Sequence, residues 1–145
     1  MKLTYARGFC FAAACLPLLA TAQTVPLQPG EYEVTAAMTF SNVQEKAKPD
    51  TNTRCIDAAA LANVEAVFNN RFMAGFKADA SCKVSGLAIG SGKVSYSADC
   101  QYSSVRVEGT LGNDSFSVVR TAKSKASGGI DVSTTLQAKR IGACK

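Results

Sequence analysis

Apolar and polar residues alternate strictly between Gly30 and Ser41. One side of this segment carries Tyr32, Val34, Ala36, Met38 and Phe40, and the other side carries Glu31, Glu33, Thr35 and Thr39. Because successive side chains of a β-strand point to opposite faces, a period of two predicts a strand with one buried and one solvated face. The chain must therefore build a sheet whose apolar face is covered by another layer.

The part of the chain after Ser81 shows the same preference for strands, interrupted by turns. Residues that tolerate tight-turn conformations gather at 90–92, 112–114 and 124–129. The strands expected between these turns are 81–89, 93–102 continuing into 105–111, 115–123 and 129–141. Short connections between successive strands predict an antiparallel meander.

One segment has a helical period instead. Spacings of three and four separate Ala60, Leu61, Val64, Phe68 and Phe72, which predicts an amphipathic helix over 58–73. Asp57 can cap its first turn and Gly75 can end it. A polar connection over 42–52 and a short strand over 53–56 precede the helix. Phe68, Phe72 and Phe76 would either line an apolar ligand pocket or pack the helix on the sheet.

The N-terminus has the three zones of an export signal. Lys2 and Arg7 precede an apolar run over 8–20, and small residues follow in Ala20-Thr21-Ala22. This order predicts a signal peptide over 1–22, cleaved after Ala22, and a single mature domain over 23–145. Two alternatives are a transmembrane anchor, for which the apolar run is short, and a lipoprotein, for which Ala12-Ala13-Ala14-Cys15 is a loose match.

Cleavage removes two of the six cysteines and leaves Cys55, Cys82, Cys100 and Cys144. An even number of cysteines in an exported domain predicts two disulfides rather than metal ligation or redox catalysis. If the loop at 90–92 closes a hairpin centred on Ser91, Cys82 and Cys100 lie directly opposite each other, within reach of a disulfide. The second bond then joins Cys55 to Cys144. The same register places Val84, Ala88, Val94, Tyr96 and Ala98 on the cysteine face.

Composition excludes several classes of function. The chain contains no histidine, so Ser-His-Asp triads, Cys-His pairs and imidazole metal sites are impossible. We expect no metal and no cofactor. Loss of Lys2 and Arg7 lowers the net charge from +5 to +3, and the remaining basic residues are scattered with few aromatics between them, which argues against nucleic-acid binding.

The mature sequence resembles the domain of unknown function 3617 family, a group of small exported bacterial proteins. The resemblance rests on Pro29-Gly30-Glu31-Tyr32-Glu33-Val34-Thr35, on Cys55-Ile56, on the spaced Cys82 and Cys100, and on Arg140-Ile141-Gly142-Ala143-Cys144. It implies an exported soluble domain and brings neither an established activity nor catalytic residues.

Arg140 is the charged residue that the pattern singles out. On the parity of Ile130, Val132 and Leu136 it falls on the inward face, where it would either anchor a carboxylate or phosphate ligand or pair with Glu33 or Asp99. Glu31 and Glu33 share one strand face and could form an acid/base pair or weak cation site, but such pairs usually serve solubility. Serines such as Ser95, Ser97, Ser103 and Ser104 lack an activating histidine.

These observations predict an α+β fold, with a twisted antiparallel sheet of about six or seven strands, one helix on one face and two disulfides. The expected function is a non-catalytic periplasmic or secreted module of a Gram-negative envelope, which binds an apolar small molecule or another envelope protein. Tyr32, Phe68, Phe72 and Arg140 are the expected contacts. No nucleic-acid binding and no stable membrane insertion are expected after cleavage. An inhibitor of a lytic envelope enzyme and a hydrolase are the alternatives.

Overall fold

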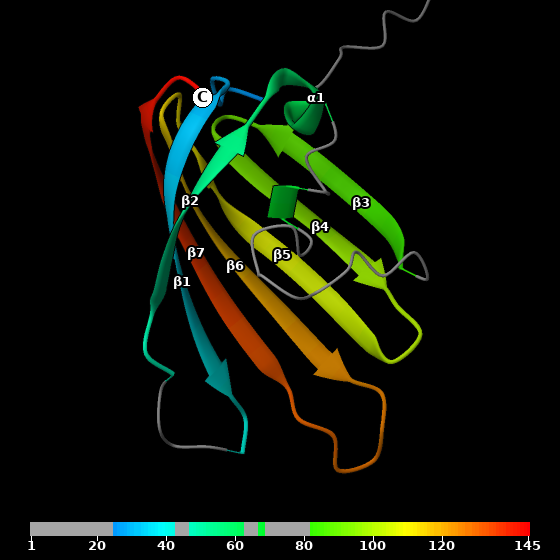
Figure 1. The fold of residues 1–145 in the computed structure, drawn as a ribbon. Helices are drawn as coiled ribbons and strands as arrows, with labels where there is room; N and C mark the ends of the chain where they lie inside the picture. Colours follow the sequence, from blue (N-terminus) through cyan, green and yellow to red (C-terminus); the bar gives the residue numbers. More distant parts are fainter. Residues whose placement is uncertain (1–24, 43–46, 63–66, 69–81) are drawn as a thin grey trace, which may run out of the picture.

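The computed structural model describes residues 25–42, 47–62, 67–68 and 82–145. Its described strands are β1 (Gly30–Phe40), β2 (Asp50–Ile56), β3 (Lys83–Gly90), β4 (Lys93–Asp99), β5 (Ser103–Leu111), β6 (Ser115–Ser124) and β7 (Val132–Gly142), and its helix is α1 (Ala58–Leu61) (Figure 1). The strands form one antiparallel sheet in the order β2-β1-β7-β6-β5-β4-β3. The predicted α+β fold and meander are confirmed, with β1 joining the meander beside β7.

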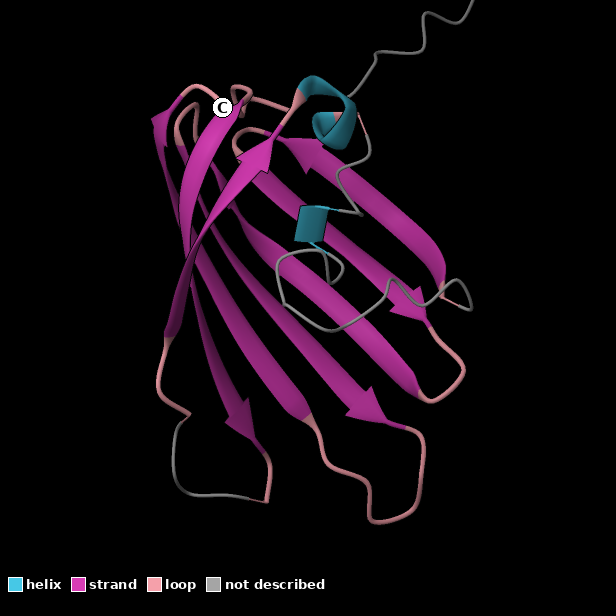
Figure 2. Cartoon of the chain, in the orientation of Figure 1, coloured by secondary structure: helices cyan, strands magenta, loops and turns pink. Residues whose placement is uncertain are grey.

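The sheet is strongly twisted, and β2 crosses in front of β1 (Figure 1). The helical residues 58–61 and 67–68 lie over the same face, which we call the inner face (Figure 2). α1 begins where expected, because the Asp57 carboxylate accepts a hydrogen bond of 2.7 Å from the Ala60 backbone N–H. The rest of the helix predicted over 58–73 lies outside the described residues.

The core extends over the inner face from the Tyr32 end of β1 to Ala98 on β4 and Val105 on β5. Cross-strand register stacks apolar side chains in rows, for example Val118 opposite Leu136 and Leu136 opposite Ala36. Tyr32, Val107 and Val118 are fully buried, and Phe68 reaches the sheet from the helical residues. The alternation predicted for β1 therefore places its apolar side against this core.

The hairpin of β3 and β4 confirms the predicted register only at its cysteine end. Val84 lies opposite Ala98 and Ser85 opposite Ser97, but the pairing then shifts by one residue. A bulge at Gly86, whose φ is +65°, absorbs the extra residue. Because the bulge reverses the parity, Leu87 and Ile89 turn toward the core, and Ala88, predicted on the cysteine face, is exposed. That assignment was wrong.

Other strand boundaries also differ from the prediction. β2 begins at Asp50 rather than at Thr53, within the segment predicted as a polar connection, and β3 spans Lys83–Gly90 rather than 81–89. The chain turns after Asp99, where the Cys100 backbone N–H donates to the Ser103 carbonyl, so 93–111 forms a hairpin rather than one continuous strand. β7 begins at Val132 instead of Gly129, because the Asp131 carboxylate accepts from the Ser124 backbone and holds the connection.

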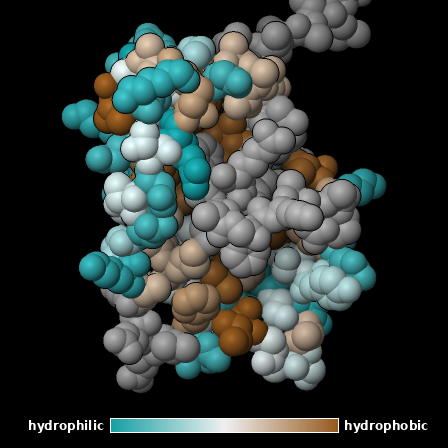
Figure 3. Space-filling model, viewed as in Figure 1, coloured by the Kyte–Doolittle hydropathy of each residue, from teal (hydrophilic) through white to brown (hydrophobic). Residues whose placement is uncertain are grey.

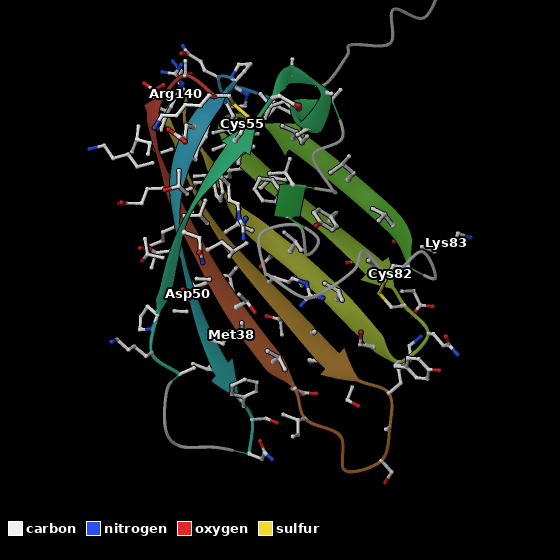
Figure 4. All side chains as sticks on the ribbon, viewed as in Figure 1. Met38, Asp50, Cys55, Cys82, Lys83 and Arg140 are labelled. Carbon is white, nitrogen blue, oxygen red and sulfur yellow. A yellow bond between two sulfur atoms is a disulfide. The ribbon has the colours of Figure 1, made fainter. Side chains whose placement is uncertain are left out.

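Both predicted disulfides are present. Cys82 is bonded to Cys100, and Cys55 to Cys144. The second bond ties the edge strand β2 to the chain end beyond β7, with β1 between them in the sheet (Figure 4). The Cys82–Cys100 bond therefore closes the β3–β4 end of the sheet, and the Cys55–Cys144 bond closes the β2 end.

We predict that Gly109→Ala destabilises the sheet by about 1–3 kcal/mol, through overpacking. A Cβ at Gly109 would press on the Ser117 carbonyl oxygen and lie 2.7 Å from the Val118 Cα, and neither backbone atom can move away without disturbing the β5–β6 pairing. Gly90→Ala is the matched control, because nothing lies within 4 Å of its Cβ position. Urea unfolding of both variants measures the difference, and equal midpoints would contradict the prediction.

Candidate functional site

Two of the four predicted contact residues are part of the core. Tyr32 is fully buried, and its hydroxyl donates a 2.6 Å hydrogen bond to the Gln28 carbonyl. Burial raises the pKa of Tyr32; the nearby Arg140 opposes that rise, and Asp114 adds to it. Phe68 packs edge-on against Phe116, with ring centroids 5.2 Å apart. Phe72 lies outside the described residues.

Arg140 lies opposite Tyr32 in the β1–β7 pairing, at the upper end of the sheet (Figure 4). Its Nε donates a 3.0 Å hydrogen bond to the Pro29 carbonyl oxygen. The ion pair considered for it with Glu33 or Asp99 is not formed: Glu33 is exposed opposite Lys139, and Asp99 pairs with Lys125 at 2.7 Å. Arg140 therefore fastens the segment that enters β1.

The opposite end of the inner face is more open. Five half-buried apolar side chains lie there in cross-strand rows of β1, β7 and β6. We call them the open apolar patch: Ala36, Met38, Phe40, Ala122 and Val132. Figure 3 shows tan and brown surface at the lower end of this face, and Figure 4 places Met38 there. The patch is continuous with the core, because Leu136 lies directly opposite Ala36 and is only 2% exposed.

Arg120 is the charged residue at this patch. It follows Phe116 and Val118 on the inner face of β6 and precedes Ala122, with Val107 opposite on β5 and Thr134 opposite on β7. Its Nε is buried without a hydrogen-bond partner among the described residues. Burial lowers the pKa of Arg120, and the nearby Tyr96 opposes the shift. A guanidinium in such surroundings can donate hydrogen bonds to an anionic partner.

Sequence reasoning did not select Arg120, although a signal was available. Phe116, Val118, Arg120 and Ala122 occupy alternate positions of one strand, so the charge stands at a position that parity assigns to the inner face. Arg54 also lies on this face, and its Nε is likewise buried without a partner among the described residues. Arg54 lies opposite Tyr32, whereas Arg120 lies in the row of Met38. Tyr32 and Met38 are six residues apart on β1, which is about 20 Å along the strand.

The outer face has a different character. A shallow cavity of about 390 Å³ lies over β3 to β6, lined mainly by small hydroxyl side chains and by charged residues: Ser85, Ser97, Asp99, Ser104, Arg106, Thr121 and Lys123. Arg106 is paired with Glu108 and Asp99 with Lys125, and these pairs are largely exposed. Charges on this face are therefore satisfied by neighbours and water, unlike Arg120.

The described part of the chain holds no cluster of three or more acidic, cysteine or histidine residues placed to bind a metal ion. It also holds no helix of the length and apolar character that crossing a membrane requires.

Comparisons with known proteins identify a family. A family model described as a protein of unknown function (DUF3617) matches residues 27–144. The search of curated proteins and the search of solved structures find no match for the chain. The matched range contains every described strand and both disulfides. The chain therefore belongs to the DUF3617 family of proteins of unknown function.

Proposed function

We propose that this protein is an exported, non-catalytic binding module that holds one small apolar chain on the open apolar patch. The observation that carries the proposal is the patch itself, a half-buried apolar surface that continues the core. Transfer of an apolar chain from water onto such a surface is favourable. The absence of histidine from the sequence supports a binding role over the commonest hydrolytic mechanisms.

The size of the patch favours a small molecule over a protein partner. Residues 36–40 of β1 extend about 13 Å, and three neighbouring strands span about 10 Å, so the patch covers roughly 130 Å². A standard protein interface needs about 800 Å² from each partner. A single acyl chain matches the smaller area.

Export is the second part of the proposal. It is supported by the signal-like residues 1–22 and by the two disulfides, which persist in oxidising compartments. Periplasmic delivery would give the domain access to single-chain lipids of the envelope.

Native mass spectrometry of the protein purified from the periplasm without reduction tests both parts. We expect a mass that begins at Gln23, lacks two hydrogens for each disulfide, and includes a bound molecule with an acyl chain. An intact N-terminus would contradict export. A protein that carries no ligand and does not bind added dodecanol would contradict the binding role.

Substitution within the patch locates the binding surface. We expect Met38→Asn to weaken binding of dodecanol about tenfold, because it removes a large apolar side chain from the surface. Thr39→Asn is the control, since Thr39 is exposed on the outer face of the same strand. Dodecanol titrations and thermal melts of both variants separate lost contact from lost fold, and equal affinities would place the site elsewhere.

A further inference from the structure

We propose that Arg120 binds the carboxylate of a fatty acid whose hydrocarbon chain lies on the open apolar patch. This inference rests on the proposed binding function and specifies its ligand as an amphipathic monocarboxylate. Its structural basis is the buried Nε of Arg120, which has no hydrogen-bond partner among the described residues and lies next to the apolar side chains of the patch.

In the part of the chain that the structure describes, no acidic side chain forms an ion pair with Arg120. Among the described residues, the ion pairs are Arg106 with Glu108 and Lys125 with Asp99. The side chains directly opposite Arg120 are Val107 and Thr134, which carry no charge. Arginine stays protonated even where burial disfavours the charge, so the positive charge persists on this face.

Leaving a buried N–H unpaired costs about 1–3 kcal/mol, and more for a charged group. A neutral side chain of similar length at position 120 would avoid that cost, and buried unsatisfied groups are rare in native proteins. An anionic ligand group completes the hydrogen bonding that the fold omits. Thr134, buried and directly opposite, places a hydroxyl-bearing residue beside the same position.

A single arginine at this position favours a ligand with one negative charge. Arg54, whose Nε is also buried without a partner among the described residues, lies in the row of Tyr32, about 20 Å from the row of Arg120 along the strands. A single guanidinium balances one carboxylate and can bind it with two parallel hydrogen bonds. A phosphate dianion would retain an unbalanced charge on an apolar surface.

The adjacent apolar side chains determine the rest of the ligand. Ala122 follows Arg120 on the same face of β6, Val132 lies opposite Ala122, and Phe40 lies opposite Val132. A chain attached to a carboxylate at Arg120 can therefore extend over this row and the Met38 row toward the open lower end of the sheet (Figure 4).

The test compares dodecanoate with dodecanol, which has the same chain without the charge, by calorimetry at pH 8 on the full mature protein. We expect the wild type to bind dodecanoate about tenfold or more tightly than dodecanol, as a charge-assisted hydrogen bond implies. Arg120→Met should abolish this preference, so that dodecanoate and dodecanol bind with similar affinities. Its melting temperature should stay equal or rise, because the substitution removes a desolvated charge.

Arg106→Gln is the matched control, because Arg106 is an exposed arginine on the outer face of the neighbouring strand. It should keep the preference for dodecanoate. Equal affinities of the wild type for the two ligands, or a preference that survives Arg120→Met, would overturn the assignment of Arg120 while leaving the binding function intact. Failure of the wild type to bind either ligand would overturn both.

Discussion

Replacing Cys55 and Cys144 together by serine is expected to lower the free energy of unfolding by about 4.6 kcal/mol, the larger of the two disulfide effects. The bond links residues 89 positions apart, whereas Cys82 and Cys100 are 18 apart. In the chain-entropy model, closing a longer loop removes more conformational freedom from the unfolded chain. The model gives about 4.6 kcal/mol for the Cys55–Cys144 bond and about 3.2 kcal/mol for the Cys82–Cys100 bond. A typical domain has only about 5–15 kcal/mol in total.

Guanidinium unfolding under non-reducing conditions measures this difference. The Cys82→Ser/Cys100→Ser variant is the comparison, since it opens the shorter loop and leaves β2 tied to the chain end. If the Cys82 and Cys100 variant were the less stable of the two, loop entropy would not be the dominant contribution.

Phe116→Ala is expected to destabilise the fold by about 3–5 kcal/mol. Phe116 is 4% exposed, and its ring contacts Phe68 and Tyr32, with centroid distances of 5.2 and 6.3 Å. Alanine would remove the ring that joins the helical residues to the sheet and leave a cavity between two strands. Aromatic contacts add to the loss from apolar burial alone.

Val119→Ala is the matched control on the same strand, because Val119 points to the outer face and is 42% exposed. Its effect should lie within about 0.5 kcal/mol of zero, as is usual for surface positions. Urea unfolding followed by circular dichroism compares the variants. A loss for Phe116→Ala below about 1 kcal/mol, which is roughly the mean for any substitution, would mean that the helical residues do not depend on this ring.

Arg120 and Phe116 illustrate two uses of one strand. Both lie on the inner face of β6, four residues apart, yet Phe116 completes the core, while the buried Nε of Arg120 has no hydrogen-bond partner among the described residues. Functional sites are where local rules of stability are commonly broken. A stabilising effect of Arg120→Met together with loss of carboxylate binding would show that trade-off directly.

Much of the sheet could be predicted from local patterns. The alternation in Gly30–Phe40 identified β1 and its buried face, and the turn at 90–92 placed Cys82 opposite Cys100. The prediction failed at Ala88, because a bulge at Gly86 depends on how the twisted strands fit together rather than on the alternation itself. Local periodicity specifies faces, and a single inserted residue reverses them.

The sequence by itself determined most of the strands and their faces, the cysteine pairing and the exclusion of histidine chemistry, because these depend on periodicity, spacing and composition. Only the tertiary structure decided which inward-facing polar groups have hydrogen-bond partners and which aromatic side chains belong to the core. It buried Tyr32 and Phe68 in the core and gave Arg140 the Pro29 carbonyl as a partner. It placed Arg120 between Val107 and Thr134, where its Nε has no partner within the described ranges. Charge compensation depends on residues brought together from distant parts of the chain, so no local pattern can reveal its absence.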